Sequence, residues 1–251
     1  MSETFDFAGV FDEDYLYFYE SMLDGERNER ETTAIIELLG LTPGDTVLDV
    51  PCGHGRISNR LAQRGFSVTG VDVTPLFLER ARTDAAARGV DVTYIQGDMR
   101  SLTFDSEFDA LANWFTSFGY FDDETNRSVL AGFRRALKPG GKLIMEHLNR
   151  DRVIRNLPEQ GLPPRVILFE HGKDFMTDRI ELDALTGRTH TERTIVRDGS
   201  VRRTTFTVRT FTFPEIRDWL LGAGFSRVEG FGAQGEPFSL YSQRTIVIAT
   251  A

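Results

Sequence analysis

The order of hydrophobic and polar positions predicts a regular alternation of strands and helices over the first 150 residues. Short apolar runs predict five strands, at 47–50, 66–72, 90–96, 108–112 and 142–147. Stretches with helical spacing predict helices at 30–39, 56–64, 75–89 and 122–136. Because strand and helix alternate, we expect right-handed βαβ units and a doubly wound, mostly parallel sheet.

Residues 148–212 break this alternation. Period-two patterns predict strands at 165–171, 174–182, 188–197 and 201–212, and Asp198-Gly199 is a strong signal for a tight hairpin between the last two. A connection of this length inside a doubly wound fold predicts an inserted antiparallel sheet, which we expect to cover the edge of the main sheet where the parallel strands end. A helix at 215–221 and strands at 227–231 and 244–249 follow.

The candidate chemistry begins with the first strand, Thr46-Val-Leu-Asp-Val-Pro-Cys-Gly-His-Gly55. Gly53 and Gly55 allow a sharp turn and leave no side chain between the backbone and a ligand, while the next helix offers unpaired N–H groups. These features predict a nucleotide-like ligand. Asp49, at the carboxyl end of the strand, suits a cationic one.

Two more strands end in acids. Asp72 ends the second strand, where a carboxylate is placed to accept from two ribose hydroxyls. Asp98, in Gly97-Asp98-Met99, follows the third strand and can accept from an amino group such as that of adenine. We therefore expect three carboxylates at one edge of the sheet.

Composition narrows the function. The net charge of −9 would repel phosphate backbones, so a nucleic-acid partner is not expected. No apolar run reaches membrane-spanning length and the N-terminus lacks the plan of a signal peptide, so we expect a cytoplasmic protein without a membrane partner. The single cysteine, Cys52, excludes a Cys-based zinc site; no metal is expected, and Cys52 is interpreted as a small buried residue rather than a reactive thiol.

Four motifs in register resemble the class I S-adenosylmethionine (SAM) dependent methyltransferases: Leu48-Asp-Val-Pro-Cys-Gly-His-Gly55, Gly70-Val-Asp72, Gly97-Asp98-Met99 and Leu137-Lys-Pro-Gly-Gly-Lys-Leu143. The family more often has Thr, Ser or Pro where His54 stands. The resemblance implies a seven-stranded Rossmann-like sheet and SAM as cofactor, with S-adenosylhomocysteine (SAH) as product. The cofactor-binding residues it implies are Tyr19, Asp49, Gly53, Gly55, Asp72, Val73, Asp98, Met99 and Asn113.

Within this family the chain is similar to small-molecule enzymes with a β-sheet lid, including aminosugar N,N-dimethyltransferases. Those share the Gly-Asp-Met-Arg100 segment and a run matched by Phe115-Thr-Ser-Phe-Gly-Tyr120. By that resemblance Tyr120 is a catalytic candidate that contacts or deprotonates an amine. His147, at the tip of the fifth strand, is either a general base or a structural residue. The loop 113–116 lacks the Pro-Pro motif of nucleobase methyltransferases.

We expect three parts: an N-terminal helical cap at 1–29, a SAM-binding domain at 30–147 and 213–251, and a substrate-binding lid at 148–212. Residues 1–20 are aromatic and acidic, which fits either a helix docked on the core or a cap over cofactor and substrate. Weaker candidates for the reaction face or for substrate contact are Tyr17, Trp114, Ser117, Glu236 and Tyr241.

The expected function is transfer of the SAM methyl group to a nucleophilic nitrogen or oxygen of a small-molecule acceptor, as in natural-product or amino-sugar biosynthesis. A C-methyltransferase and a non-catalytic SAM or SAH binding module stay open as alternatives. An NAD-dependent oxidoreductase is disfavoured because Ser58 stands at the third glycine position and no second catalytic domain follows. A homodimer is compatible with the sequence.

Overall fold

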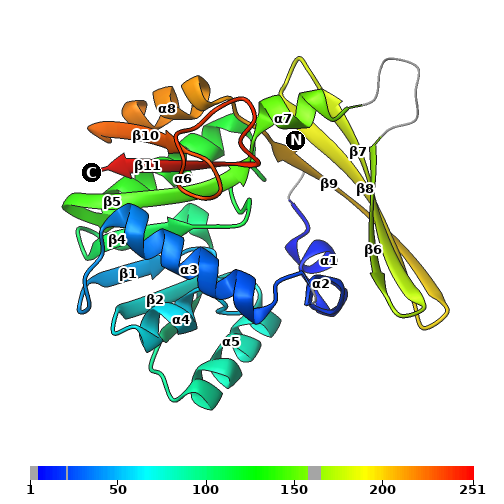
Figure 1. Cartoon of the computed structure of the whole chain (residues 1–251), viewed down its shortest axis with the longest axis horizontal. Coiled ribbons are helices and arrows are strands. Elements are labelled where there is room, and N and C mark those ends of the chain that lie inside the picture. Colours follow the sequence, from blue (N-terminus) through cyan, green and yellow to red (C-terminus); the bar gives the residue numbers. More distant parts are fainter. Residues whose placement is uncertain (1–4, 21, 158–164) are drawn as a thin grey trace.

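The structure is a computed structural model that describes residues 5–20, 22–157 and 165–251. Its main feature is a seven-stranded sheet in the order β10-β11-β5-β4-β1-β2-β3 (Figure 1). β11 is antiparallel to both neighbours, and every other pairing is parallel. The predicted doubly wound, mostly parallel sheet is therefore confirmed. Its strands are β1 (Thr46–Asp49), β2 (Ser67–Asp72), β3 (Thr93–Gln96), β4 (Phe108–Asn113), β5 (Leu137–Leu148), β10 (Arg227–Phe231) and β11 (Arg244–Thr250).

Helices cover both faces of this sheet. α3 (Gly25–Leu39), α4 (Ser58–Gln63) and α5 (Pro75–Arg88) lie on one face, and α6 (Asp123–Ala136) and α8 (Phe213–Gly222) on the other. The neighbours Val47 and Leu48 pack into the two different cores, as the period of a strand requires. Burial on both faces explains why these strands read as continuous apolar runs. The helix predicted from residue 30 begins five residues earlier, behind the N-cap Asp24.

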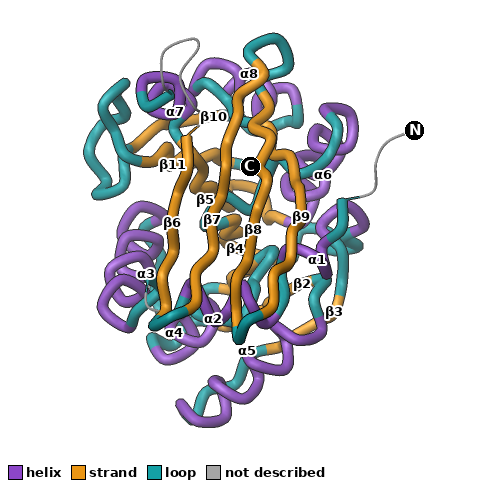
Figure 2. The backbone as a smooth tube through the Cα atoms, turned by 90° about the vertical axis from the view of Figure 1, so that its right-hand side faces the viewer, coloured by secondary structure: helices purple, strands orange, loops and turns teal. Residues whose placement is uncertain are grey.

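The predicted inserted sheet is also confirmed. β6 (Arg165–His171), β7 (Asp174–Asp183), β8 (Arg188–Arg197) and β9 (Ser200–Arg209) form a separate four-stranded antiparallel sheet, which Figure 2 shows face on. Arg197 pairs with Ser200 across the predicted hairpin. Asp198 and Gly199 both have positive φ, 50° and 77°, as the tight turn requires.

Two details of this region differ from the prediction. The last strand ends at Arg209 rather than at Thr212, because Thr210 turns away to donate its N–H to Gly187 and Thr212 becomes the N-cap of α8. A helix that was not predicted, α7 (Arg150–Arg155), begins directly after its N-cap residue, Asn149. The Asn149 side chain accepts from the backbone N–H groups of the first turn of α7, a capping signal that was present in the sequence.

Two short helices, α1 (Phe7–Val10) and α2 (Glu13–Tyr19), lie between the two sheets (Figure 1). α2 docks on the four-stranded sheet: Phe18 is buried against Met176 and Ile195, and the Tyr17 hydroxyl donates to Asp174 at 2.9 Å. Asp14 adds ion pairs with arginines of β8 and β9. The main partner of α2 is therefore the lid and not the core of the large sheet. The three-part domain division stays a prediction, and its boundary at residue 30 falls inside α3.

Among the described residues, no helix combines the length and the hydropathy that a membrane span needs. The cytoplasmic location stays a prediction.

The end of β9 contacts the loop after β4 at Gly119, and this contact leads to a prediction about stability. Gly119 has φ +104°, its carbonyl accepts from the Arg209 N–H at 2.7 Å, and a Cβ there would lie 2.5 Å from the Arg209 carbonyl oxygen. Gly119→Ala should lower the free energy of unfolding by about 2 kcal/mol or more, because strain at positive φ adds to a backbone clash. Urea unfolding measures it.

Gly140→Ala is the matched control for this substitution. Gly140 also has positive φ, +78°, but no atom lies within 4 Å of the added Cβ. Gly140→Ala should lower the free energy of unfolding only by the conformational strain, about 1 kcal/mol. Equal losses in the two variants would show that the contact with Arg209 does not constrain Gly119.

Candidate functional site

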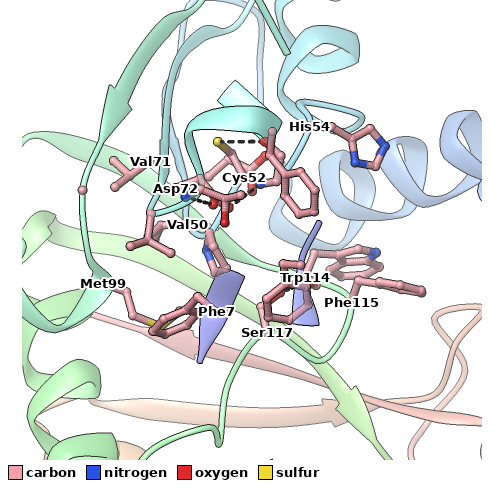
Figure 3. A pocket seen from close by; sticks show the side chains of 18 of the residues that line it. Phe7, Val50, Cys52, His54, Val71, Asp72, Met99, Trp114, Phe115 and Ser117 are labelled. Carbon is pink, nitrogen blue, oxygen red and sulfur yellow. Dashed lines mark hydrogen bonds between the residues drawn. The ribbon is translucent and has the colours of Figure 1, made fainter. Parts of the chain in front are cut away.

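A pocket opens at the carboxyl ends of the parallel strands, beside the turn after β1. It contains about 860 Å³ of empty space when its open mouth is included. Residues from the tips of β1, β2 and β4, from the segment after β3 and from the N-terminal helices line it. Phe7 and Met99 lie at one end and Trp114 and Phe115 at the other (Figure 3).

The two glycines of the turn have different roles. Both have positive φ, +54° at Gly53 and +78° at Gly55. A Cβ on Gly55 would lie 2.4 Å from the Tyr94 hydroxyl, so Gly55 is required for the turn to pack on its neighbours. A Cβ on Gly53 would come no closer than 4.0 Å to a neighbouring atom, and Gly53 lines the pocket. Gly53 is therefore the glycine that leaves room for a ligand.

Asp72 connects the tip of β2 to this turn. Its carboxylate accepts from the Gly53 N–H and from the Thr74 N–H, each at 2.8 Å, and it is 5% exposed. Burial raises the pKa of this carboxyl. The two hydrogen bonds fix its orientation and leave each oxygen a lone pair free, so it can still accept from a pair of hydroxyls.

Asp49 lies deeper, 2% exposed, and accepts from the Ser58 hydroxyl at 2.5 Å. Burial raises the pKa of Asp49 to about 7, although the bond from Ser58 and the charge of Arg56 oppose the shift. The charge of Asp49 therefore changes near neutral pH. A buried carboxylate at this depth favours a cationic ligand group.

Asp98 lines the same pocket but is already engaged. Its two oxygens accept from the Arg100 guanidinium at 2.5–3.0 Å, and one also accepts from the Arg100 N–H. Burial acts to raise the pKa of Asp98, but the bonds from Arg100 outweigh it and hold the pKa below its usual value. All three predicted carboxylates thus line one pocket, and Val73 and Met99 line it beside them.

The loop after β4 closes another side. Trp114 lines the pocket and donates its indole N–H to Glu31 at 2.9 Å. Glu31 also accepts from Arg56 at 2.6 Å and from Arg27 at 2.7 Å. The guanidinium groups of Arg27 and Arg56 both lie over the ring of Phe115, about 5 Å from its centre. Phe115 has φ +64°, a strained conformation that these contacts hold in place.

The sequence-based prediction missed Arg56. It left open whether the aromatic segment at residues 1–20 docks on the core or covers cofactor and substrate, and described residues of this segment supply most of the aromatic wall of the pocket. Arg56 follows Gly55 directly, so its position was readable as the start of the helix after the turn. Phe7, Phe11 and Tyr15 of the N-terminal segment line the pocket together with Tyr120. The ring of Phe11 lies 5.4 Å from that of Tyr15 and 5.8 Å from that of Tyr120.

Burial raises the pKa of both tyrosines of this wall, Tyr15 and Tyr120. Both are therefore neutral phenols at physiological pH. A neutral phenol can donate or accept a hydrogen bond, and the role of Tyr120 toward an acceptor stays a prediction. Ser117 also lines the pocket, with its hydroxyl bound to the Trp114 carbonyl.

Besides Gly55, three residues predicted for the site do not line this pocket. Tyr19 stacks on Tyr15 with ring centres 4.4 Å apart, and its hydroxyl accepts from Arg193 of the lid at 3.3 Å. Asn113 donates to the Val50 carbonyl at 2.8 Å, while its own side-chain oxygen is buried without a partner among the described residues.

His147 is the third. It is 4% exposed, lies against the ring of Phe211, and has its Nδ1 3.0 Å from the Leu148 carbonyl. Burial lowers the pKa of His147 to about 4. Its position supports the structural interpretation of this histidine rather than the catalytic one.

Of the weaker candidates, Trp114 and Ser117 line the pocket and the other three do not. Tyr17 contacts the lid, and Glu236 and Tyr241 do not line the pocket, with Tyr241 79% exposed. His54 does line it, and burial with nearby arginines lowers the pKa of His54 to about 4. Cys52 lines it as a small buried side chain whose thiol pKa is raised by burial, in keeping with an unreactive role.

The raised pKa of Asp49 predicts a pH dependence of stability. The folded state keeps a proton that the unfolded chain releases near pH 4, so wild-type stability should fall, relative to Asp49→Asn, as pH rises from about 4 to 7. This relative loss in the free energy of unfolding should approach about 4 kcal/mol and stay constant above pH 7. Urea unfolding of the ligand-free protein across this range measures it.

Asp109→Asn is the control, because the effect of pH on the stability that this carboxylate contributes should have the opposite sign. Lys138 lowers the pKa of Asp109 to about 2, so the stability that this carboxylate contributes should be lost as pH falls through its folded pKa. If wild type and Asp49→Asn give parallel pH profiles, Asp49 is not held protonated in the folded state.

Comparisons with known proteins agree with this geometry. The model of the family described as "Methyltransferase domain" matches residues 47–141. The chain is 30% identical over 213 residues to a cypemycin N-terminal methyltransferase from a Streptomyces species, a match that covers 82% of each chain. The chain spans about half the length of the first curated relatives that it matches.

Solved structures share the fold, including the inserted sheet. The CcbJ methyltransferase from Streptomyces caelestis superposes with a TM-score of 0.80 at 18% identity, covering 98% of this chain and 99% of that one. A SAM-bound amino pentose methyltransferase from Micromonospora echinaspora gives 0.67 at 20% identity, covering 99% of each. With the glycine turn, the acidic strand tips and the near-full-length relative together, the chain belongs to the class I SAM-dependent methyltransferases.

Proposed function

We propose that this protein transfers the methyl group of SAM to a nucleophilic nitrogen or oxygen of a small-molecule acceptor. The observation that carries the proposal is Asp72, which is oriented by the N–H groups of Gly53 and Thr74 in a pocket that the aromatic wall also lines. The buried carboxylates can accept hydrogen bonds from SAM, and the aromatic wall can contact an acceptor.

The pocket residues fit SAM group by group. Asp72 would accept from the ribose hydroxyls, and the open side of Gly53 admits the chain of the ligand close to the backbone. Val73 and Met99 offer apolar contact to the adenine, and Asp98 lies beside them. Asp49 suits the amino group of the methionine part, and the guanidinium of Arg56, which lines the same pocket, suits its carboxylate.

When bound, SAM supplies a methyl group activated on a sulfonium, and the chain has to align and enclose the reactants. Phe7, Phe11 and Tyr15 exclude water from one side of the pocket. Orientation of two reactants in a closed site is worth roughly 7 to 11 kcal/mol of the barrier. The neutral phenols of Tyr15 and Tyr120 can hold an acceptor amine or hydroxyl by hydrogen bonds without removing its proton. We propose no residue of this chain as an obligatory base.

Two observations support a small acceptor that presents an amine. The pocket is covered by α1 and α2, which leaves no open platform for a nucleic acid, and the net charge is −9. The names of relatives include a glycine/sarcosine N-methyltransferase, a cypemycin N-terminal methyltransferase and an amino pentose methyltransferase, and also two ubiquinone biosynthesis O-methyltransferases. We propose nitrogen as the first acceptor atom to test; natural-product or amino-sugar biosynthesis and a homodimer remain predictions.

Cofactor binding is tested at Asp72. Asp72→Asn should weaken SAH binding about tenfold or more, measured by isothermal titration calorimetry, because the variant loses the charged acceptor for the ribose hydroxyls. Asp91→Asn is the matched control, an exposed carboxylate just before β3, at the other end of the sheet. Unchanged SAH affinity in Asp72→Asn, or binding of NAD in place of SAH, would contradict the proposed cofactor.

Methyl transfer is tested with labelled SAM over a panel of amines, hydroxyls and carboxylates. With an acceptor found, Tyr15→Phe and Tyr120→Phe should each lower kcat/KM about tenfold while SAH affinity stays within twofold, because the lost hydroxyls contact the acceptor. Tyr241→Phe is the control, since Tyr241 is largely exposed and lies outside the pocket. No transfer to any member of a broad panel, with SAH bound normally, would favour the binding module.

A further inference from the structure

A second cavity lies beside the first, between the N-terminal helices and the α4–α5 side of the large sheet. Tyr15, Tyr17 and Tyr19 of α2 line one side of it. The other side carries the guanidinium groups of Arg56, Arg60, Arg80 and Arg88. Tyr15, His54 and Arg56 line both cavities, so the two adjoin at these residues.

Four arginines line this cavity although the protein as a whole carries a net charge of −9. Arg60 pairs with Glu29 and Arg56 with Glu31, and neither acid lines the cavity. Among the residues that the structure describes, Arg80 has no carboxylate within 4 Å of its guanidinium. Arg80 is exposed, so a ligand can reach it.

The arginines also act on two titratable groups of this cavity, together with burial. The pKa of His54 is lowered to about 4 by burial and by the charges of Arg56 and Arg80. The pKa of the Arg60 guanidinium is lowered by burial and by the charge of Arg88. Acids are also present, because Glu20, Asp24 and Asp84 line the cavity. Asp24 is used as the N-cap of α3, and Asp84 is bound by Arg88 and Asn59.

We propose that this second cavity binds an anionic group, a carboxylate or a phosphate, of the same acceptor molecule whose nucleophile enters the first pocket. Guanidinium groups bind both anions through paired N–H donors, and the tyrosines of α2 offer a flat surface for the part of the acceptor between its two ends. The inference rests on the proposed function, since it assigns the acceptor to a class: small molecules with an amine or hydroxyl at one end and a negative charge at the other.

The test uses inorganic pyrophosphate as the probe, with inorganic phosphate and acetate as further arms that separate phosphate from carboxylate recognition. Binding to the full-length protein is measured by isothermal titration calorimetry with and without saturating SAH. Arg80→Glu should weaken pyrophosphate binding about fivefold or more while SAH affinity stays within twofold. Arg227→Glu is the matched control, because Arg227 is 70% exposed on β10 and its ion-pair partner is Glu229.

The outcomes separate the inference from the proposed function. Pyrophosphate binding that persists with SAH bound and is lost in Arg80→Glu supports the inference. Equal effects of Arg80→Glu and Arg227→Glu would overturn it, because they would show a non-specific charge effect. Displacement of pyrophosphate by SAH would also overturn it, since the cavity would then hold the cofactor's own carboxylate. If the wild type does not bind SAH at all, the proposed function fails, whatever the anion does.

Discussion

The site depends on one interaction, the pair of hydrogen bonds by which Asp72 holds the Gly53 N–H and the Thr74 N–H. It connects the turn after β1 to the tip of β2, so the two segments that shape the pocket floor cannot move independently. The carboxylate is buried and its charge is costly without partners, so the bonds stabilise both the fold and the orientation of the group. Asp49 and the segment after β3 are then arranged around this fixed point.

The second constraint is the position of the N-terminal helices. α2 contacts the four-stranded sheet through Phe18, Tyr17 and Asp14, while Phe7, Phe11 and Tyr15 face the pocket. The inserted sheet therefore does not supply described residues to the pocket lining. It contacts α2, which it holds beside the pocket. An inserted sheet can thus shape a pocket through the helix that it positions.

The fold and the pocket floor were predictable because both follow from short-range patterns. Apolar periodicity gives the strands, parallel connection brings their carboxyl ends together, and Asp49, Asp72 and Asp98 all meet at one pocket. The aromatic wall was harder to predict, because the side that Tyr15 faces depends on docking between segments over a hundred residues apart. His147 was placed at the correct edge, but its side chain points into the core beside Phe211, and a strand tip alone does not settle that direction.

The two cavities adjoin at Tyr15, His54 and Arg56, and Tyr15 is the one of these three residues that α2 carries. A change in the position of α2 therefore alters both cavities together, because the same helix also carries Tyr17 and Tyr19, which line the second. The four-stranded sheet holds α2 through Phe18 and Asp14, so contacts far from either cavity fix the shape of both.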